Sequence, residues 1–386
     1  MSTTRSNSCL LPANHERIHL KRNIMNRPRV RPTCFRLAFV FSLMCVFPVT
    51  CVGEERPIQN TGEPADLNKP VQVFIMLGQS NMLGFGKVGP QDKVGTLEKL
   101  TKSDGKYPHL LKPDQSWSER NDVRYVQLMH RRGNMSILRD EWLTVKGAHI
   151  GPELQFGHIM GEVLNAPVLV IKSCIGNRSL GWDLLPPGSE SFEYDGKIYA
   201  GYKQSPLSWD KGTDPEPIEW YAGKQYDDDI GNAKKILANI GDYYPGAKEY
   251  EVAGFVWWQG HKDQNPAHAS RYEQNLVHFI KTLRKDFDAP DAKFVLATIA
   301  FGGDELKGDG LKVAEAQLAV SGDRGKYPEF VGNVKAIDAR PYWRDKSVSP
   351  SGAGYHYNHN AETYMEVGDD LGWAMAELMA TTQESP

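Results

Sequence analysis

The chain has 386 residues, which is enough for one large domain or two small ones. Its net charge of −3 and its pI near 6.4 argue against nucleic acid or an anionic membrane surface as a partner. Hydrophobic residues make up 40% and charged residues 24% of the chain, as is ordinary for a soluble globular protein.

The N-terminal segment differs from the rest of the chain. Residues 16–36 are rich in Arg and Lys, an apolar stretch with small residues at its end follows over 37–53, and acidic residues come next. This pattern predicts a secretory signal over residues 1–53, cleaved near Gly53, and hence a secreted or periplasmic protein. An uncleaved N-terminal anchor is the alternative, although the stretch is shorter than the ~20 residues of a typical span. We interpret the polar residues 54–70 as a linker.

Cysteine usage favours a large core over disulfides as the source of stability. Four of the five cysteines lie in the predicted leader, and Cys174 alone remains in the body of the chain. An exported protein with one cysteine has no internal disulfide. The body of the chain is long enough to bury a sizeable core.

Short apolar runs beyond the linker predict strands. They end in or just before small or polar residues, and such runs are typical of strands buried on both faces of a parallel sheet. The predicted strands are 71–77, 166–173, 252–258, 293–300 and 330–338.

Amphipathic segments alternate with these runs and predict helices over 152–164, 227–244, 269–287 and 360–382. The alternation predicts an α/β fold, a three-layer α/β/α sandwich whose parallel sheet has about five strands. We expect one domain over residues 71–382, with the first strand central as in flavodoxin-like sheets. Residues 88–150 and 184–226 lack clear periodicity, and we interpret them as insertions that cover or shape a site.

Polar residues follow the predicted strands where ligands of open parallel sheets bind. The first strand leads into Gln79, Ser80 and Asn81, and the second leads into Gly176 and Asn177. Gln259 to Asp263 follow the third strand, Asp338 ends the fifth, and His356 precedes the last predicted helix.

These residue types suit nucleophilic acyl transfer. A serine hydroxyl needs a base, usually His, and an acid that orients the base. The developing oxyanion needs donors such as backbone N–H groups or an amide. We expect Ser80 as the nucleophile, His356 as the base, and Gly176 N–H and Gln259 as oxyanion donors.

Five segments carry a resemblance to a known family. Residues 78–82 (GQSNM) resemble the first block of the SGNH hydrolases, in the branch of sialate O-acetylesterases and carbohydrate esterase family 6. Residues 171–180, with a lysine-containing strand and the oxyanion glycine, resemble the second block of that branch. Residues 151–154, 256–260 (VWWQG) and 356–358 resemble further segments, the last of them the block of the catalytic His.

The resemblance implies a serine esterase without a cofactor or metal. The oxyanion hole would comprise the N–H groups of Ser80 and Gly176 and the amide of Gln259. Gln79, Asn81 and Asn177 would contact the substrate.

The sequence departs from the family pattern at the acid of the triad. Many SGNH enzymes have Asp three residues before the His, where this chain has Ala353. His261 stands where the branch often has Glu. We rank Asp263 first as the acid and Asp338 second. A backbone carbonyl that holds the imidazole is a third possibility.

Other interpretations remain open for several of these residues. Ser80 could be only a helix N-cap, and Gln259 could only satisfy buried backbone groups. His261, His356 and His359 with Asp263 could bind zinc, although their spacing is loose. Lys172 lies in an apolar strand and needs a partner.

The expected function is removal of O-acetyl groups from a carbohydrate by a secreted serine esterase. The alternative is an SGNH-like domain that binds a carbohydrate without turning it over. The expected partner is an acetylated carbohydrate, with no nucleic acid and no integral membrane domain beyond a possible N-terminal anchor.

Overall fold

The computed structural model of the chain describes residues 58, 62–131 and 133–383. The predicted leader and the first residues of the predicted linker lie outside these residues. Within residues 62–131 and 133–383, no helix combines the length and apolarity needed to span a bilayer.

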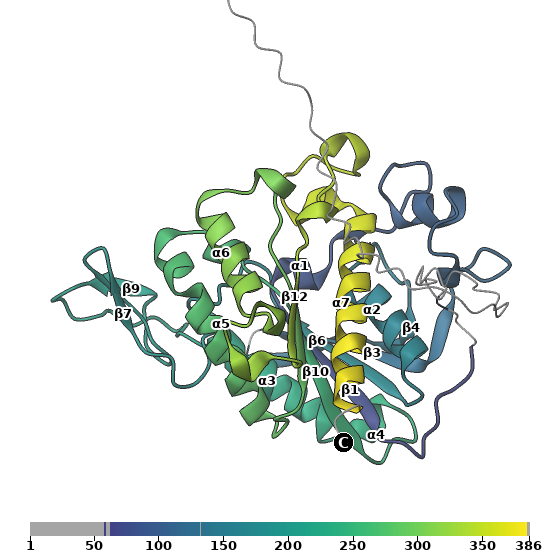
Figure 1. Cartoon of the computed structure of the whole chain (residues 1–386), viewed down its shortest axis with the longest axis horizontal. Coiled ribbons are helices and arrows are strands. Elements are labelled where there is room, and N and C mark those ends of the chain that lie inside the picture. The colour runs from purple at the N-terminus through teal and green to yellow at the C-terminus, as the bar shows by residue number, and fades with distance from the viewer. Residues whose placement is uncertain (1–57, 59–61, 132, 384–386) are drawn as a thin grey trace, which may run out of the picture. The chain divides into compact units, whose positions relative to one another are not determined.

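A seven-stranded sheet forms the centre of the fold (Figure 1). The strand order is β12-β11-β10-β1-β6-β3-β4, and all neighbouring strands are parallel except β3 and β4. The strands are β1 (Val71–Gly78), β3 (Glu119–Arg131), β4 (Asn134–Thr144), β6 (Val168–Cys174), β10 (Tyr250–Trp258), β11 (Lys293–Ala297) and β12 (Val334–Ile337).

The predicted number of about five strands was too low, because β3 and β4 lie in the first predicted insertion, 88–150. The other five strands are those predicted. Their order places the second, first, third, fourth and fifth side by side, which is the flavodoxin-like order. The first strand is therefore central, as predicted.

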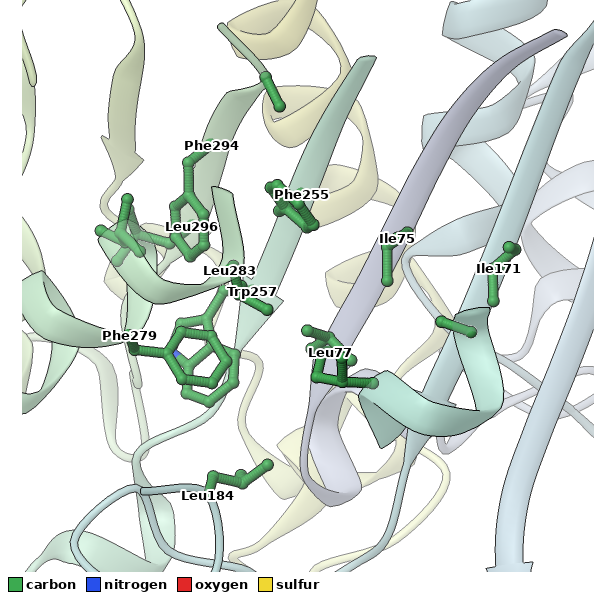
Figure 2. Packing of buried hydrophobic residues seen from close by; sticks show 14 of the residues in the cluster. Ile75, Leu77, Ile171, Leu184, Phe255, Trp257, Phe279, Leu283, Phe294 and Leu296 are labelled. Atoms are coloured by element: carbon green, nitrogen blue, oxygen red, sulfur yellow. The ribbon is translucent and has the colours of Figure 1, made fainter. Parts of the chain in front are cut away.

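Helices cover both faces of the sheet and complete the three layers. Buried side chains of α3, α5 and α6 pack with Ile75 and Leu77 on one face, and Figure 2 shows Phe279 and Leu283 of α5 on this face. Those of α2 and α7 pack with Phe74 and Met76 on the other. The alternation follows from the pleat of β1, whose successive side chains point to opposite faces. The helices are α1 (Ser80–Leu83), α2 (Glu153–Val163), α3 (Lys224–Leu237), α4 (Ile240–Tyr243), α5 (Pro266–Asp286), α6 (Gly308–Ala319) and α7 (Ala361–Gln383).

The helix predictions differ from the structure in two places. The helix predicted over 227–244 is two helices, α3 and α4, separated at residues 238–239. Helix α6 was not predicted because its sequence, GDGLKVAEAQLA, begins with two glycines that favour a turn.

The second predicted insertion, 184–226, contains a small antiparallel sheet of β7 (Phe192–Tyr194), β8 (Lys197–Tyr199) and β9 (Ser208–Asp210). We call it the arm, and Figure 1 shows it at the left, away from the central sheet. Two short strands, β2 (Gly86–Lys87) just before the first insertion and β5 (His149–Ile150) at its end, pair with each other.

Candidate active site

Ser80 lies at the carboxyl end of the central strand β1, as the first residue of helix α1. Gly78 precedes it where a Cβ atom would collide with the carbonyl oxygen of Trp258, so the chain needs glycine there. The residue at the N-cap position is Gln79, and no side chain caps this helix. Ser80 is therefore not explained as an N-cap. Its Oγ lies 3.5 Å from Nε2 of Gln79, so the hydroxyl is only weakly held.

Two backbone amides beside this hydroxyl lack an acceptor. Gly176 lies against Ser80: a Cβ atom built on the glycine would be 3.6 Å from Cβ of Ser80. Within the described part of the chain, neither the N–H of Ser80 nor that of Gly176 donates a hydrogen bond. Unpartnered N–H groups next to a nucleophile are what an oxyanion hole requires.

Gln259 is fully buried, and its side-chain amide is hydrogen-bonded to other groups of the protein. Its Nε2 donates to Oε1 of Gln79 at 3.1 Å, to the carbonyl of Arg178 at 2.8 Å and to Oδ2 of Asp263 at 2.6 Å. Its Oε1 accepts from the hydroxyl of Tyr272 at 2.9 Å. This geometry favours the structural interpretation of Gln259 over that of an oxyanion donor, because an amide has only two N–H groups to donate.

Asp263 anchors the loop that follows β6. Its carboxylate accepts from the N–H groups of Leu180 and Gly181, both at 2.8 Å, as well as from Gln259. Nδ1 of His268 lies 3.3 Å from Oδ1 of the same carboxylate. The structure places no hydrogen bond between Asp263 and His356, which are the pair expected from the sequence.

Asp338, the second candidate for the acid, also has other partners. Arg340 donates to both of its carboxylate oxygens, at 2.8 Å and 3.0 Å from Nε. The hydroxyl of Thr298 is 3.4 Å away. The pKa of Asp338 is lowered by the hydrogen bonds and charge of Arg340, which outweigh partial burial. This carboxylate is thus the partner of Arg340.

His356 begins a left-handed turn. His356, Tyr357, Asn358 and His359 have φ values of 49°, 49°, 53° and 60°. Such a conformation costs roughly 1–2 kcal/mol for each non-glycine residue, so the surroundings must hold it. Oδ1 of Asn358 accepts from Gly354 N–H at 2.8 Å, and the buried ring of Tyr357 stacks on Trp258 with ring centroids 5.1 Å apart.

The imidazole of His356 has aromatic neighbours and no hydrogen-bond partner among the described residues. Phe85 stacks on it with ring centroids 4.0 Å apart and an angle of 6° between the rings. Burial, followed by the charges of His359 and His261, lowers the pKa of His356 to about 4. The imidazole is therefore neutral, and able to accept a proton, down to unusually low pH.

Comparison with known proteins places the chain in a family. Residues 70–377 match the model of the family described as "Carbohydrate esterase, sialic acid-specific acetylesterase". The chain belongs to this family. It is an ester hydrolase of the carbohydrate acetylesterase type.

The chain is also similar to a curated protein and to solved structures. The esterase is 24% identical over 297 residues to a probable carbohydrate esterase of Arabidopsis thaliana, covering 75% of this chain and 85% of the relative. A solved structure from Arabidopsis thaliana covers 80% of this chain and 98% of its own, with a TM-score of 0.45 and 19% identity. The crystal structure of NanS covers 84% of this chain and 100% of its own, with a TM-score of 0.45 and 13% identity.

A pocket of about 740 Å³ opens beside the proposed oxyanion loop of the esterase. It begins at Asn177, the residue after Gly176, and extends to Tyr199 on the arm. Trp182 and Lys262 also line it. Its volume is in the range of small-molecule sites, and the arm supplies one wall of it.

The three residues predicted to contact the substrate differ in their exposure. Asn177 is exposed at the pocket, with a left-handed φ of 60°. Gln79 is fully buried and lies between Ser80 and Gln259. Asn81 is also fully buried, and its amide N and O have no partner among the described residues. Only Asn177 among them is accessible from the pocket.

Lys172 has the partner that its burial requires. Its Nζ lies 2.8 Å from Oε2 of Glu153 and donates to the carbonyl of Leu83 at 2.9 Å. Glu153 in turn accepts from Gly151 N–H at 3.1 Å. The ion pair therefore links β6, the start of α2 and the end of α1, which carries Ser80.

The zinc interpretation receives no geometric support. Among the described residues, no three or more His, Cys, Asp or Glu side chains are grouped so that they could hold a metal ion. His356 and His359 have ring centroids 5.9 Å apart.

The lowered pKa of His356 gives the first testable prediction. A general base must be neutral, so kcat/KM is lost as pH falls through the pKa of the free enzyme. We expect the acid limb of kcat/KM for p-nitrophenyl acetate near pH 4, well below the ~6.5 of an ordinary histidine. Rates measured in constant ionic strength buffers across this range check the prediction, and a limb near pH 6.5 would contradict it.

Proposed function

We propose that this protein removes O-acetyl groups from a carbohydrate through an acetyl-enzyme on Ser80. The observation that carries the proposal is the pair of unpartnered N–H groups, of Ser80 and Gly176, beside a weakly held serine hydroxyl. Family membership supports the acetylated carbohydrate as substrate.

In the first half of the reaction, Oγ of Ser80 attacks the acetyl carbonyl carbon and His356 takes the hydroxyl proton. The carbonyl oxygen becomes an oxyanion, to which the N–H groups of Ser80 and Gly176 donate. The intermediate collapses as the bond to the sugar oxygen breaks, and His356 returns the proton to that oxygen.

In the second half, water attacks the acetyl ester of Ser80. His356 takes a proton from the water, and the same two N–H groups hold the second oxyanion. Collapse releases acetate and returns the proton to Oγ of Ser80, so the enzyme is regenerated.

Export of the protein is also a proposal. It rests on the basic, apolar and small-residue pattern of residues 1–53. N-terminal sequencing of the mature protein from its native host tests it, because a cleaved signal would give a start near Gly53.

Labelling with a fluorophosphonate separates the esterase from a domain that only binds carbohydrate. An activated serine reacts with this probe, and we expect mass spectrometry of a digest to find it on Ser80. A screen of acetate release over acetylated glycans then identifies the sugar. A protein that binds glycan but is neither labelled nor active would overturn the proposal in favour of the binding domain.

The second prediction concerns the pocket wall. Replacing Tyr199 with alanine removes a half-buried ring from the pocket. We expect KM for an acetylated glycan to rise by about fivefold, since an aromatic contact contributes about 1 kcal/mol beyond area burial. KM for p-nitrophenyl acetate should be unchanged because this ester lacks the sugar.

Lys197→Ala is the matched control, because Lys197 is exposed on the same strand and pairs with Asp210 within the arm. It should leave both KM values unchanged. Equal effects of Tyr199→Ala on the two substrates would contradict a role of the arm in binding the sugar.

A further inference from the structure

The ring of Phe85 stacks on the face of the His356 imidazole, and among the described residues no acid is hydrogen-bonded to this imidazole. A triad acid fixes the plane and the tautomer of the imidazole through a hydrogen bond. In the described part of the chain, the ring of His356 has no such bond. Its nearest ring neighbours are Phe85 at 4.0 Å, nearly parallel and stacked, and Tyr355 at 4.9 Å, nearly perpendicular.

The backbone of Phe85 is held in place on both sides. At Gly84, which has a φ of 92°, a Cβ atom would lie 2.6 Å from the N of Gly151. At Gly86 it would lie 2.9 Å from the ring of Tyr364. Both glycines therefore permit a close approach that larger residues would prevent, and the half-buried ring of Phe85 is presented from a fixed position.

Phe85 also belongs to the segment that carries the nucleophile. The N–H of Gly84 donates to the carbonyl of Ser80 at 3.2 Å. Lys172 holds the carbonyl of Leu83 at 2.9 Å. The position of Phe85 is thus fixed relative to Ser80, although His356 is distant in sequence.

A second contact ties the two backbones together. The hydroxyl of Tyr364, on α7, donates to the carbonyl of His356 at 3.4 Å, and its ring lies against Gly86, the residue that follows Phe85. Tyr364 is fully buried. Tyr364 therefore contacts both the backbone of His356 and the segment that carries Phe85.

We propose that Phe85 is a positioning residue, whose ring face holds the imidazole of His356 in the orientation that serves Ser80. The proposal rests on the proposed function. Phe85 acts through His356 and does not itself exchange a proton.

The groups around His356 are consistent with this role. His359 on the same turn and His261 after β10 affect it through their charge, and both effects oppose its protonation. Tyr355 and Tyr364 contact it without charge. His149 and Lys87, from β5 and β2, act on His359. A stacked apolar ring adds burial to these effects, and burial is the largest cause of the lowered pKa of His356.

The test compares variants that separate stacking from apolar bulk. Phe85→Tyr keeps the planar face, Phe85→Leu keeps apolar bulk without it, and Phe85→Ala removes both. We expect kcat for p-nitrophenyl acetate to fall by about 10²-fold in Phe85→Leu, the effect of a misplaced catalytic group. Its KM should be unchanged, and Phe85→Tyr should stay within about threefold of the original enzyme.

Two readouts exclude a merely structural effect. In Phe85→Ala the acid limb of kcat/KM should move up from near pH 4, toward the ~6.5 of a hydrated histidine. In a His356→Ala background, Phe85→Leu should lower the residual rate no further, because the two residues act as one unit.

The outcomes distinguish this inference from the proposed function. If Ser80→Ala abolishes activity but Phe85→Leu retains the original kcat, the inference is overturned and the esterase mechanism stands. Independent effects of Phe85→Leu and His356→Ala would also overturn it. Activity that survives Ser80→Ala would instead remove the proposed function on which it rests.

Discussion

The Ser80→Ala variant is expected to release acetate from p-nitrophenyl acetate and from acetylated glycan at the background rate. Removing the serine of a catalytic triad lowers kcat by about 10⁶-fold in a well-studied hydrolase. We expect the acetyl ester to form on the hydroxyl of Ser80, which this variant lacks. Single-turnover assays with the variant check the prediction.

The fold of Ser80→Ala should be intact. Among the described residues, Oγ of Ser80 makes a single hydrogen bond, of 3.5 Å, with Gln79, so its loss leaves no strongly held donor or acceptor unsatisfied. We expect the free energy of unfolding to change by less than about 1 kcal/mol. Urea denaturation of both proteins measures this, and a folded but inactive variant would separate chemistry from stability.

Ser179→Ala is a matched control for the serine. Ser179 is buried in the loop that follows β6, and its hydroxyl donates to Asp183 at 3.0 Å. Removal of this hydroxyl costs one hydrogen bond, or about 1 kcal/mol of stability. The Ser179→Ala variant should therefore keep most of the activity. Equal activity of Ser80→Ala and the control would remove Ser80 from the mechanism.

The central strands could be predicted because a strand buried on both faces is apolar throughout. VQVFIMLG of β1 and VLVIKSC of β6 are of this kind. Strand β3 (ERNDVRYVQLMHR) alternates buried and partly exposed residues and carries several charges. Its neighbour β4 is at the edge of the sheet. Sequence periodicity alone therefore left both strands within an insertion.

Motifs within one segment were enough to propose Ser80 and Gly176 as site residues, since each lies close to the end of its strand. The partners of Asp263 could not be predicted, because Leu180 and Gly181 are more than eighty positions away in sequence. Phe85 was missed for a similar reason. In sequence it is an aromatic residue between two glycines, and its relation to His356 depends on how α7 packs against β2.

The Asp263→Asn variant is expected to lose stability and activity together. The carboxylate is fully buried and accepts from Leu180 N–H, Gly181 N–H and Gln259. Asparagine has the same size but offers one oxygen, so its NH₂ group must face a buried donor. An unsatisfied buried donor costs about 1–3 kcal/mol, and more where the lost acceptor was charged. We expect the free energy of unfolding to fall by about 3 kcal/mol.

The activity of Asp263→Asn should fall because the anchored residues follow Gly176 closely. A displaced oxyanion donor costs about 10²- to 10³-fold in kcat. Asp338→Asn is the control, since its partly exposed pairing with Arg340 should contribute no more than about 1 kcal/mol. Denaturation and steady-state kinetics of both variants provide the comparison.

The two roles of Asp263 predict different results for the same variant. If Asp263 is the acid that orients His356, its replacement by Asn should lower kcat by about 10⁴-fold, because the imidazole takes the wrong tautomer, and should leave the geometry of the site intact. If Asp263 is instead an anchor of the loop, its replacement should lower stability and activity together. The acid limb of kcat/KM near pH 4 should then stay in place, because His356 keeps its surroundings. Undiminished stability with a 10⁴-fold loss of kcat would return Asp263 to the triad. Because the carboxylate already has three hydrogen-bond donors and His268 beside it, we expect the result of an anchor.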